Sequence, residues 1–221
     1  MLEFLEIETG VAPDAAVIWL HGLGADGHDF EPIVPELGLH DRAIRFVFPH
    51  APVRPVTING GMQMRAWYDI KDNAIRREDE SGVRQSQSAV EALIAREKQR
   101  GLAASRLVLA GFSQGGAIAL QTALRHPERL AGILALSTYL PLADLLPAEA
   151  SAANRGLPIF MAHGSADPVI QIPKAVASRE ALQSLGYPID WHEYRMPHSV
   201  CAEEILHIAA WLRAVLPPLR S

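Results

Sequence analysis

The chain has 221 residues, of which 49% are hydrophobic, and this composition is typical of a globular protein with one large core. Its formal net charge of −5 argues against a nucleic-acid partner, and a single cysteine, Cys201, excludes an intrachain disulfide. The acidic N-terminus and the lack of a long apolar run predict a cytoplasmic protein without stable membrane insertion.

Short apolar runs alternate with longer amphipathic segments along the chain. Because several runs are almost continuously apolar, they suit strands buried on both faces of a parallel sheet. The alternation predicts one α/β domain over residues 1–221, with a mostly parallel central sheet, helices on both faces and no large cap domain. We expect an edge strand at 2–8, strands at 15–20, 43–48, 106–110, 130–136, 157–162 and 189–194, and helices at 81–100, 114–125, 174–185 and 201–216.

Two stretches carry the strongest local signals. Residues 49–72 contain three prolines, paired glycines and several large apolar side chains, which predicts a long irregular connection of the kind that is often functional. Residues 111–115, Gly-Phe-Ser-Gln-Gly, stand between a predicted strand and a predicted helix. A G-x-S-x-G pentapeptide in that context predicts a nucleophile elbow, in which Ser113 occupies a strained turn with its hydroxyl exposed.

A serine nucleophile needs a general base, and the order along an α/β-hydrolase chain is serine, acid, histidine. Among the later histidines, His192 falls inside a predicted strand and His207 inside a predicted helix, whereas His198 lies in the loop between them. Catalytic side chains favour loops at strand ends. The predicted base for Ser113 is therefore His198.

The predicted acid is Asp167, which follows the strand expected at 157–162 in another strand-end loop. Asp144 lies in a Leu- and Ala-rich segment of helical character, and Asp190 lies within a predicted strand. An aspartate in such a loop also commonly stabilises its own turn, which is the alternative role for Asp167.

Acyl transfer also requires N–H donors for the developing oxyanion. The backbone N–H of Gln114, directly after the nucleophile, is one candidate. The N–H of Leu23 is the other, because residues 21–24, His-Gly-Leu-Gly, follow an early strand and glycines allow close approach to a substrate. His21 precedes the serine in the chain, so we expect it to hold this loop by hydrogen bonds.

No metal and no cofactor is predicted. The histidines and the single cysteine show no metal-ligand spacing. Residues 22–27, Gly-Leu-Gly-Ala-Asp-Gly, match the G-x-G-x-x-G pattern of dinucleotide sites. However, the chain continues loop-like after them, and no acidic residue follows the second strand, as a dinucleotide site requires.

Together these motifs resemble the phospholipase/carboxylesterase family of small α/β-hydrolases, which includes the acyl-protein thioesterases. The resemblance implies an α/β-hydrolase fold, a triad of Ser113, Asp167 and His198, and oxyanion N–H groups from Leu23 and Gln114. Nearly the whole chain takes part, in the family's order, through residues 21–27, 67–69, 111–116, 164–169 and 197–200.

Two segments depart from the family pattern and affect the expected shape of the pocket. Residues 137–139, Ser-Thr-Tyr, stand where a glycine commonly follows the serine, and Met196-Pro197 stands where a glycine often precedes the histidine. An apolar acyl groove is expected near the site, with core or loop packing as the alternative role of each member. Its predicted substrate-binding residues are Leu23, Met62, Met64, Trp67 and Tyr139.

The predicted activity is that of a serine carboxylesterase acting through an acyl-enzyme on Ser113. A thioesterase or a lysophospholipase uses the same machinery and stays an alternative, as does an inactive hydrolase-fold protein that binds a ligand or a partner. The expected binding partner is a small-molecule acyl ester or thioester. Exposed apolar residues near the pocket could support a homodimer, which some relatives form.

Overall fold

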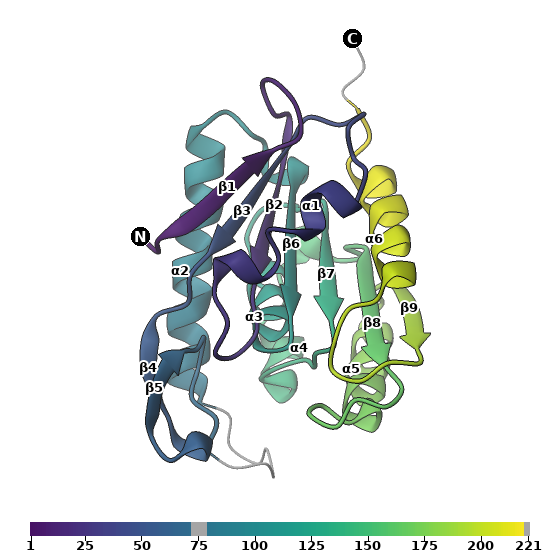
Figure 1. Ribbon diagram of the computed structural model, residues 1–221. Helices are drawn as coiled ribbons and strands as arrows, with labels where there is room; N and C mark the ends of the chain where they lie inside the picture. The colour runs from purple at the N-terminus through teal and green to yellow at the C-terminus, as the bar shows by residue number, and fades with distance from the viewer. Residues whose placement is uncertain (72–78, 219–221) are drawn as a thin grey trace.

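The computed structural model describes residues 1–71 and 79–218 and has a seven-stranded sheet at its centre (Figure 1). The strand order is β1-β3-β2-β6-β7-β8-β9, in which β1 runs antiparallel to β3 and every other neighbouring pair is parallel. The strands are β1 (Phe4–Glu8), β2 (Ala15–Leu20), β3 (Ile44–Pro49), β6 (Leu107–Phe112), β7 (Gly132–Leu136), β8 (Ile159–Gly164) and β9 (Ile189–Tyr194). The predicted mostly parallel sheet with an edge strand at the N-terminus is confirmed.

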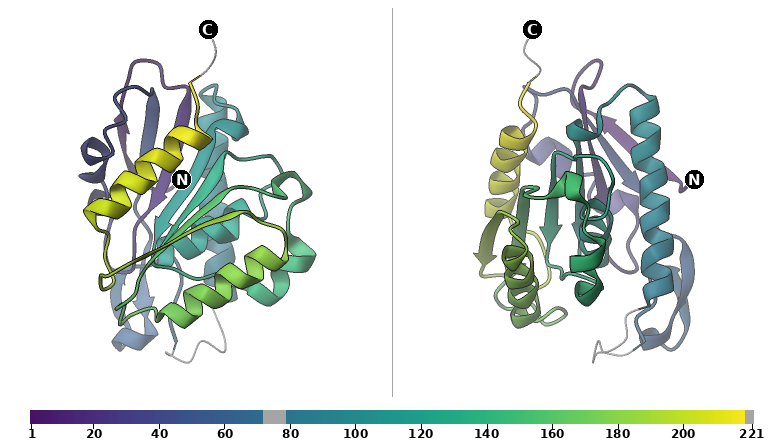
Figure 2. Two further views of the ribbon diagram at one scale, coloured as in Figure 1. Left: turned by 90° about the vertical axis from the view of Figure 1, so that its right-hand side faces the viewer. Right: turned by 180° about the vertical axis from the view of Figure 1, so that it is seen from behind.

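Helices cover both faces of the sheet, as predicted (Figure 2). One face packs against α2 (Glu80–Gln99), α3 (Gln114–Ala123), α4 (Leu146–Glu149) and α5 (Ile172–Ser184). The other face packs against α1 (Ile33–Glu36) and α6 (Ala202–Val215). The bounds of the long helices and of the sheet strands lie within two residues of those expected from the sequence.

The alternation of side chains along each strand divides the core into two layers. In β2, Ile18 and Leu20 belong to the layer beneath α2 and α3, whereas Val17 and Trp19 belong to the layer beneath α1 and α6. All of these side chains are 0–1% exposed. A strand that contributes to both layers has no polar face, which explains why its sequence is an unbroken apolar run.

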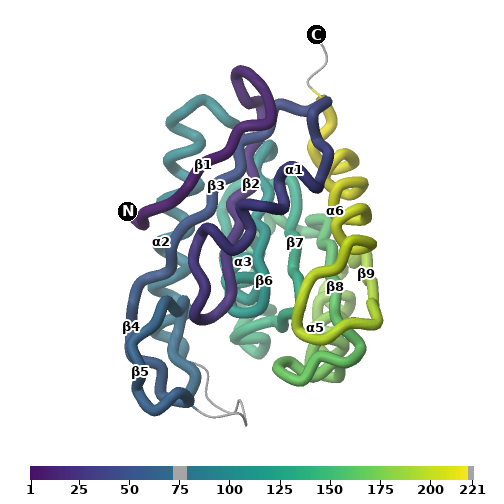
Figure 3. The backbone as a smooth tube through the Cα atoms, in the orientation of Figure 1, coloured from purple at the N-terminus to yellow at the C-terminus, as the bar shows by residue number. Residues whose placement is uncertain are grey.

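The prediction of an irregular connection over residues 49–72 is wrong for its middle part, residues 53–65, and its last residue, Asp72, lies outside the described residues. The segment forms an antiparallel hairpin of β4 (Val53–Val56) and β5 (Met62–Arg65), which extends beyond the main sheet (Figure 3). Gly60 and Gly61 adopt positive φ angles of 68° and 79° at the turn between the strands. The hairpin escapes a pattern search because its strands are short and exposed, with Val53 60% and Met62 63% exposed.

In the part of the chain that the structure describes, no helix is both long enough and apolar enough to cross a bilayer. Short 3-10 helices occupy several connections, at Gly27–Asp29, Thr57–Asn59, Ala104–Arg106, Ala143–Leu145 and Ala152–Asn154. The 3-10 helix Gly27–Asp29 follows β2. The segment that connects β2 to this helix contains Leu23 and lies at the carboxyl end of the parallel strands. β6 and β8 end at the same edge of the sheet, so the loops after β2, β6 and β8 converge there (Figure 1).

Candidate active site

Ser113 occupies a sharp turn between β6 and α3, with φ 55° and ψ −121°. A non-glycine residue with this backbone conformation is strained and persists only where its surroundings fix it. A Cβ at Gly111 would overlap the backbone of Gly115, and a Cβ at Gly115 would overlap the carbonyl of Leu20. The two glycines of the pentapeptide are therefore required by close backbone packing, and the strand-turn-helix geometry expected around Ser113 is present.

Asp167 and His198 are joined by a short hydrogen bond, with 2.6 Å between Asp167 Oδ2 and His198 Nδ1. The other carboxylate oxygen, Asp167 Oδ1, accepts the backbone N–H groups of Val169 at 2.8 Å and Ile170 at 2.9 Å. The side chain of Asp167 is fully buried. This aspartate therefore stabilises its own turn and, at the same time, is hydrogen-bonded to the imidazole of His198.

The loop that carries His198 packs closely on the end of β8. A Cβ at Gly164 would overlap the carbonyl oxygens of both Met196 and Pro197, so only glycine permits this approach. The His198 ring also packs against Phe112, with ring centroids 4.6 Å apart. Because Phe112 directly precedes Ser113, this contact places the imidazole beside the nucleophile turn.

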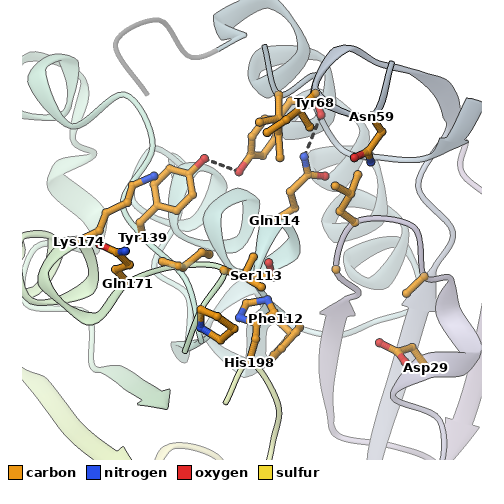
Figure 4. Close-up of a pocket in the computed structure, with 18 residues that line it drawn as sticks. Asp29, Asn59, Tyr68, Phe112, Ser113, Gln114, Tyr139, Gln171, Lys174 and His198 are labelled. Atoms are coloured by element: carbon orange, nitrogen blue, oxygen red, sulfur yellow. Dashed lines mark hydrogen bonds between the residues drawn. The ribbon is translucent and has the colours of Figure 1, made fainter. Parts of the chain in front are cut away.

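A cavity of about 790 Å³ opens at this edge of the sheet, and Ser113 and His198 both line it (Figure 4). Leu23 and Gln114 contribute to the same wall, whereas Asp167 lies behind His198 and does not reach the cavity. The volume is in the range of small-molecule binding sites. The structure thus brings the predicted nucleophile, base and oxyanion residues to one concave surface.

The backbone N–H groups of Leu23 and Gln114 donate no hydrogen bond to any residue that the structure describes. Gln114 is the first residue of α3, where backbone N–H groups have no intrahelical partner and the helix dipole favours negative charge. Both N–H groups are therefore available as donors beside the Ser113 turn.

His21 holds the Leu23 loop, as expected. Its Nε2 accepts the backbone N–H of Ala51 at 3.0 Å, and its Nδ1 lies 2.7 Å from the carbonyl oxygen of Gly22. Burial lowers the pKa of His21 to about 4, so the ring is neutral near pH 7. Since Nε2 accepts, Nδ1 carries the proton and donates to Gly22.

Two of the five residues predicted for the acyl groove line the cavity, and the other three do not. Leu23 and Tyr139 line the cavity, but Met62, Met64 and Trp67 do not. Met62 is 63% exposed. The sulfur of Met64 accepts a hydrogen bond from the side-chain amide of Asn59, within the hairpin region. Trp67 is completely buried and does not reach the cavity. Its backbone N–H and its indole N–H are both hydrogen-bonded inside the protein, to Gln114 and His21.

Several lining residues escaped the sequence analysis. Tyr68 lines the cavity, and its hydroxyl lies 2.7 Å from that of Tyr139, another lining residue (Figure 4). The only sequence signal for Tyr68 is its position in the Trp-Tyr-Asp motif. Four aliphatic residues also line the cavity, and the sequence analysis assigned none of them to a groove: Ile58, Ile70, Val169 and Ile170.

The alternative acids and bases lie elsewhere. His192 Nε2 pairs with Asp190 at 2.9 Å, His207 Nδ1 pairs with the Tyr194 hydroxyl at 2.8 Å, and none of these lines the cavity. Asp144 belongs to a short 3-10 helix and is also absent from the cavity wall. Across residues 1–71 and 79–218, no group of three or more His, Cys, Asp or Glu side chains is placed to hold a metal ion.

The fold and the strained serine turn define the class of the protein, an α/β-hydrolase of the serine hydrolase type. The family model described as Phospholipase/Carboxylesterase matches residues 4–216, and the chain belongs to this family. It is 40% identical to acyl-protein thioesterase 1 of Gibberella zeae over 92% of each chain. It is 42% identical to acyl-protein thioesterase 1 of Neurospora crassa, over 92% of this chain and 87% of that one.

A solved structure supports the same relationship. The acyl-protein thioesterase 2 of Zea mays superposes with a TM-score of 0.85 and 28% sequence identity, over 98% of this chain and 100% of that chain. The similarity extends over nearly the full length of both proteins. The protein is therefore an enzyme, a hydrolase of the carboxylesterase and thioesterase type.

Proposed function

We propose that this enzyme hydrolyses acyl esters through a triad of Ser113, His198 and Asp167 and an acyl-enzyme intermediate. The observation that carries the proposal is the 2.6 Å bond between Asp167 and His198, together with the cavity that Ser113 and His198 share. A strained serine turn, a histidine held by a buried carboxylate and free N–H donors are the parts that acyl transfer requires.

In the proposed acylation step, His198 Nε2 takes the proton of the Ser113 hydroxyl as its oxygen attacks the acyl carbonyl. Asp167 stabilises the imidazolium that forms, and it holds the ring by accepting the Nδ1 proton. The N–H groups of Leu23 and Gln114 bind the oxyanion of the tetrahedral intermediate. His198 then protonates the departing alcohol or thiol.

Deacylation repeats these events with water in place of the serine. His198 takes a proton from water, and the resulting hydroxide attacks the acyl carbonyl on Ser113. The carboxylic acid leaves as Ser113 regains its proton from His198. Apart from the substrate and water, these steps use only side chains and backbone groups of the chain.

The acyl chain is proposed to lie along the aliphatic and aromatic wall of the cavity. Ile58, Ile70 and Ile170 provide apolar surface, and Tyr139 provides an aromatic ring. The burial of apolar surface favours an acyl group by about 0.8 kcal/mol per methylene. A medium or long acyl chain is therefore favoured over acetate.

A thioester is a second candidate substrate, and a specific observation favours it. The curated relatives at 40% and 42% identity are both named acyl-protein thioesterase 1. Esters and thioesters pass through the same tetrahedral intermediate, so one site serves both. A comparison of oxygen and sulfur leaving groups on the same acyl chain separates the two assignments.

The test is hydrolysis of a p-nitrophenyl ester series from acetyl to palmitoyl, beside S-acyl thioesters of the same chains. Wild-type protein and Ser113→Ala are compared. The proposal expects activity that rises beyond acetyl and falls by at least about 10³-fold in the variant. Activity that survives Ser113→Ala would show that another group is the nucleophile, and no activity on any substrate would favour a binding role for the cavity.

A further inference from the structure

Trp67 joins the two segments that carry the free N–H donors. Its backbone N–H donates to Gln114 Oε1 at 3.0 Å, and its indole Nε1–H donates to the carbonyl oxygen of His21 at 2.8 Å. Gln114 begins α3, and His21 lies two residues before Leu23. One buried residue, through its backbone N–H and its indole N–H, therefore connects the nucleophile turn with the oxyanion loop.

The side chain of Gln114 completes the connection. Its Nε2 donates to the carbonyl oxygen of Tyr68 at 2.9 Å, while its Oε1 accepts from Trp67. The orientation of the amide is fixed, because a backbone N–H can only donate and a backbone carbonyl can only accept. Gln114 is 3% exposed, so these bonds form away from water. The residue whose backbone is a candidate oxyanion donor is thus anchored by its own side chain.

The oxyanion loop is tied to the same segment at a second point. The backbone N–H of Gly24 donates to the carbonyl oxygen of Arg65 at 2.9 Å. The rings of His21 and Trp67 also pack together, with centroids 5.4 Å apart. Leu23 therefore lies between two contacts with residues 65–67, at His21 and at Gly24.

The Trp67 segment is itself held by a long helix. Ser86 of α2 donates its hydroxyl to the carbonyl oxygen of Trp67. All three polar groups of Trp67, its N–H, its carbonyl and its indole N–H, are hydrogen-bonded in a residue with no exposed surface. A buried polar group that loses its partner costs about 1–3 kcal/mol, so this arrangement resists displacement.

We propose that Trp67 and the side chain of Gln114 form a brace that sets the distance between the Leu23 and Gln114 N–H groups. Both are positioning residues, because Trp67 does not reach the cavity and the Gln114 amide faces the protein interior. The inference rests on the proposed acyl-transfer function. It replaces the groove role expected for Trp67 from the sequence with a role in binding the transition state.

The brace has a kinetic signature that a groove wall lacks. An oxyanion exists only in the transition state and the tetrahedral intermediate, so misplaced donors lower kcat and leave substrate binding unchanged. Removal of a whole oxyanion donor costs about 10²–10³ in kcat. Displacement of a donor by a lost supporting bond should cost less, on the order of 10–10².

The test is Trp67→Phe, which keeps an aromatic ring and removes the indole N–H. The matched control is Trp19→Phe, since Trp19 is 1% exposed and its Nε1 has no hydrogen-bond partner among the described residues. For each protein, kcat and KM are measured on one ester. Inhibition is measured with an acyl trifluoromethyl ketone, which mimics the tetrahedral intermediate, and with the product carboxylic acid.

The brace predicts that Trp67→Phe lowers kcat and ketone affinity by the same factor, about 10–10², with KM and product affinity within about twofold. Trp19→Phe should leave all four values near those of wild type. An increase in KM with unchanged kcat would show that Trp67 contributes to substrate binding. Equal losses of kcat in Trp67→Phe and Trp19→Phe would show that the effect is general destabilisation. Either result overturns the proposal.

A second variant covers the case in which Trp67→Phe does not fold. Gln114→Met keeps the length of the side chain and the backbone N–H, but it removes the hydrogen bonds that the Gln114 amide makes with the Trp67 N–H and with the Tyr68 carbonyl. The same parallel loss of kcat and ketone affinity is expected, and unchanged values would contradict the brace. If Ser113→Ala retains the activity of the wild type, the acyl-transfer function itself is overturned. Failure of the brace and failure of the proposed function therefore give different results.

Discussion

The two carboxylate oxygens of Asp167 bind different partners. Oδ2 lies 2.6 Å from His198 Nδ1, and Oδ1 accepts hydrogen bonds from the backbone N–H groups of Val169 and Ile170. The N–H donors of Val169 and Ile170 prevent the carboxylate from rotating, so Oδ2 stays directed at the imidazole. The arrangement fixes both the position and the tautomer of His198. It leaves Nε2 as the nitrogen available to Ser113.

Asp167→Asn is expected to lower kcat by about 10³–10⁴ with little change in folding. The asparagine oxygen can keep the two backbone N–H bonds, which directs its NH₂ group toward His198. Nδ1 must then accept, so the proton moves to Nε2, which can no longer take the serine proton. Ester hydrolysis and thermal melting measure the two effects. A variant that retains more than about a tenth of wild-type kcat would contradict the assignment of the acid.

Gly164→Ala should displace the histidine loop without altering any reacting group. The added Cβ would overlap the carbonyl oxygens of Met196 and Pro197, which directly precede His198. A shift of about 1 Å at a catalytic group can cost about 10²-fold in rate. We therefore expect kcat to fall by about 10- to 10²-fold, while circular dichroism shows a folded protein. Wild-type kinetics in this variant would show that the loop tolerates the shift.

The chain-length preference should depend on the aliphatic wall of the cavity. Ile70 lines it, and Ile70→Trp would fill part of the roughly 790 Å³ volume. Long acyl esters should lose kcat/KM by about tenfold or more, because a bulky side chain in a close-packed site costs about 1–3 kcal/mol. The acetyl ester is the internal control and should be hydrolysed as by wild type. Equal losses for acetyl and palmitoyl esters would place Ile70 away from the acyl chain.

Glu204 should make the protein less stable as the pH rises. Burial raises the pKa of this fully buried carboxyl from 4.5 to about 8. Between those pH values the folded state binds more protons than the unfolded state, so the free energy of unfolding falls with increasing pH. Glu204→Gln removes this loss and should stabilise the protein by about 3 kcal/mol at pH 7, with little gain at pH 4.5.

Urea unfolding of wild type and Glu204→Gln from pH 4.5 to 8 measures this difference. The neighbouring Glu203 is exposed on the same turn of α6, so Glu203→Gln is the matched control and should show no such trend. A gap between wild type and Glu204→Gln that does not widen with pH would mean that Glu204 is charged in the folded protein.

The main sheet could be predicted because its central strands are buried on both faces, which leaves continuous apolar runs in the sequence. The long helix α2 is amphipathic, which leaves a helical period. The β4–β5 hairpin buries little surface, so Val53 and Met62 carry no pattern that separates a strand from a loop. The four-residue helices α1 and α4 are too short for a helical period to show.

The residues proposed to react were accessible from the sequence, because each lies in a loop directly after or beside a predicted strand and near glycines. The cavity wall was not accessible in the same way. Trp67 and Tyr68 are neighbours with similar apolar character, yet only Tyr68 reaches the cavity. The difference is set by hydrogen bonds from Trp67 to residues 46 and 47 positions away, which no local pattern encodes.

The most direct test of the proposed nucleophile is covalent labelling with a fluorophosphonate, followed by mass spectrometry of the digested protein. The account predicts one adduct, on the peptide that contains Ser113, which is absent in Ser113→Ala and forms far more slowly in His198→Ala. An adduct on another residue, or no adduct in wild type, would contradict it.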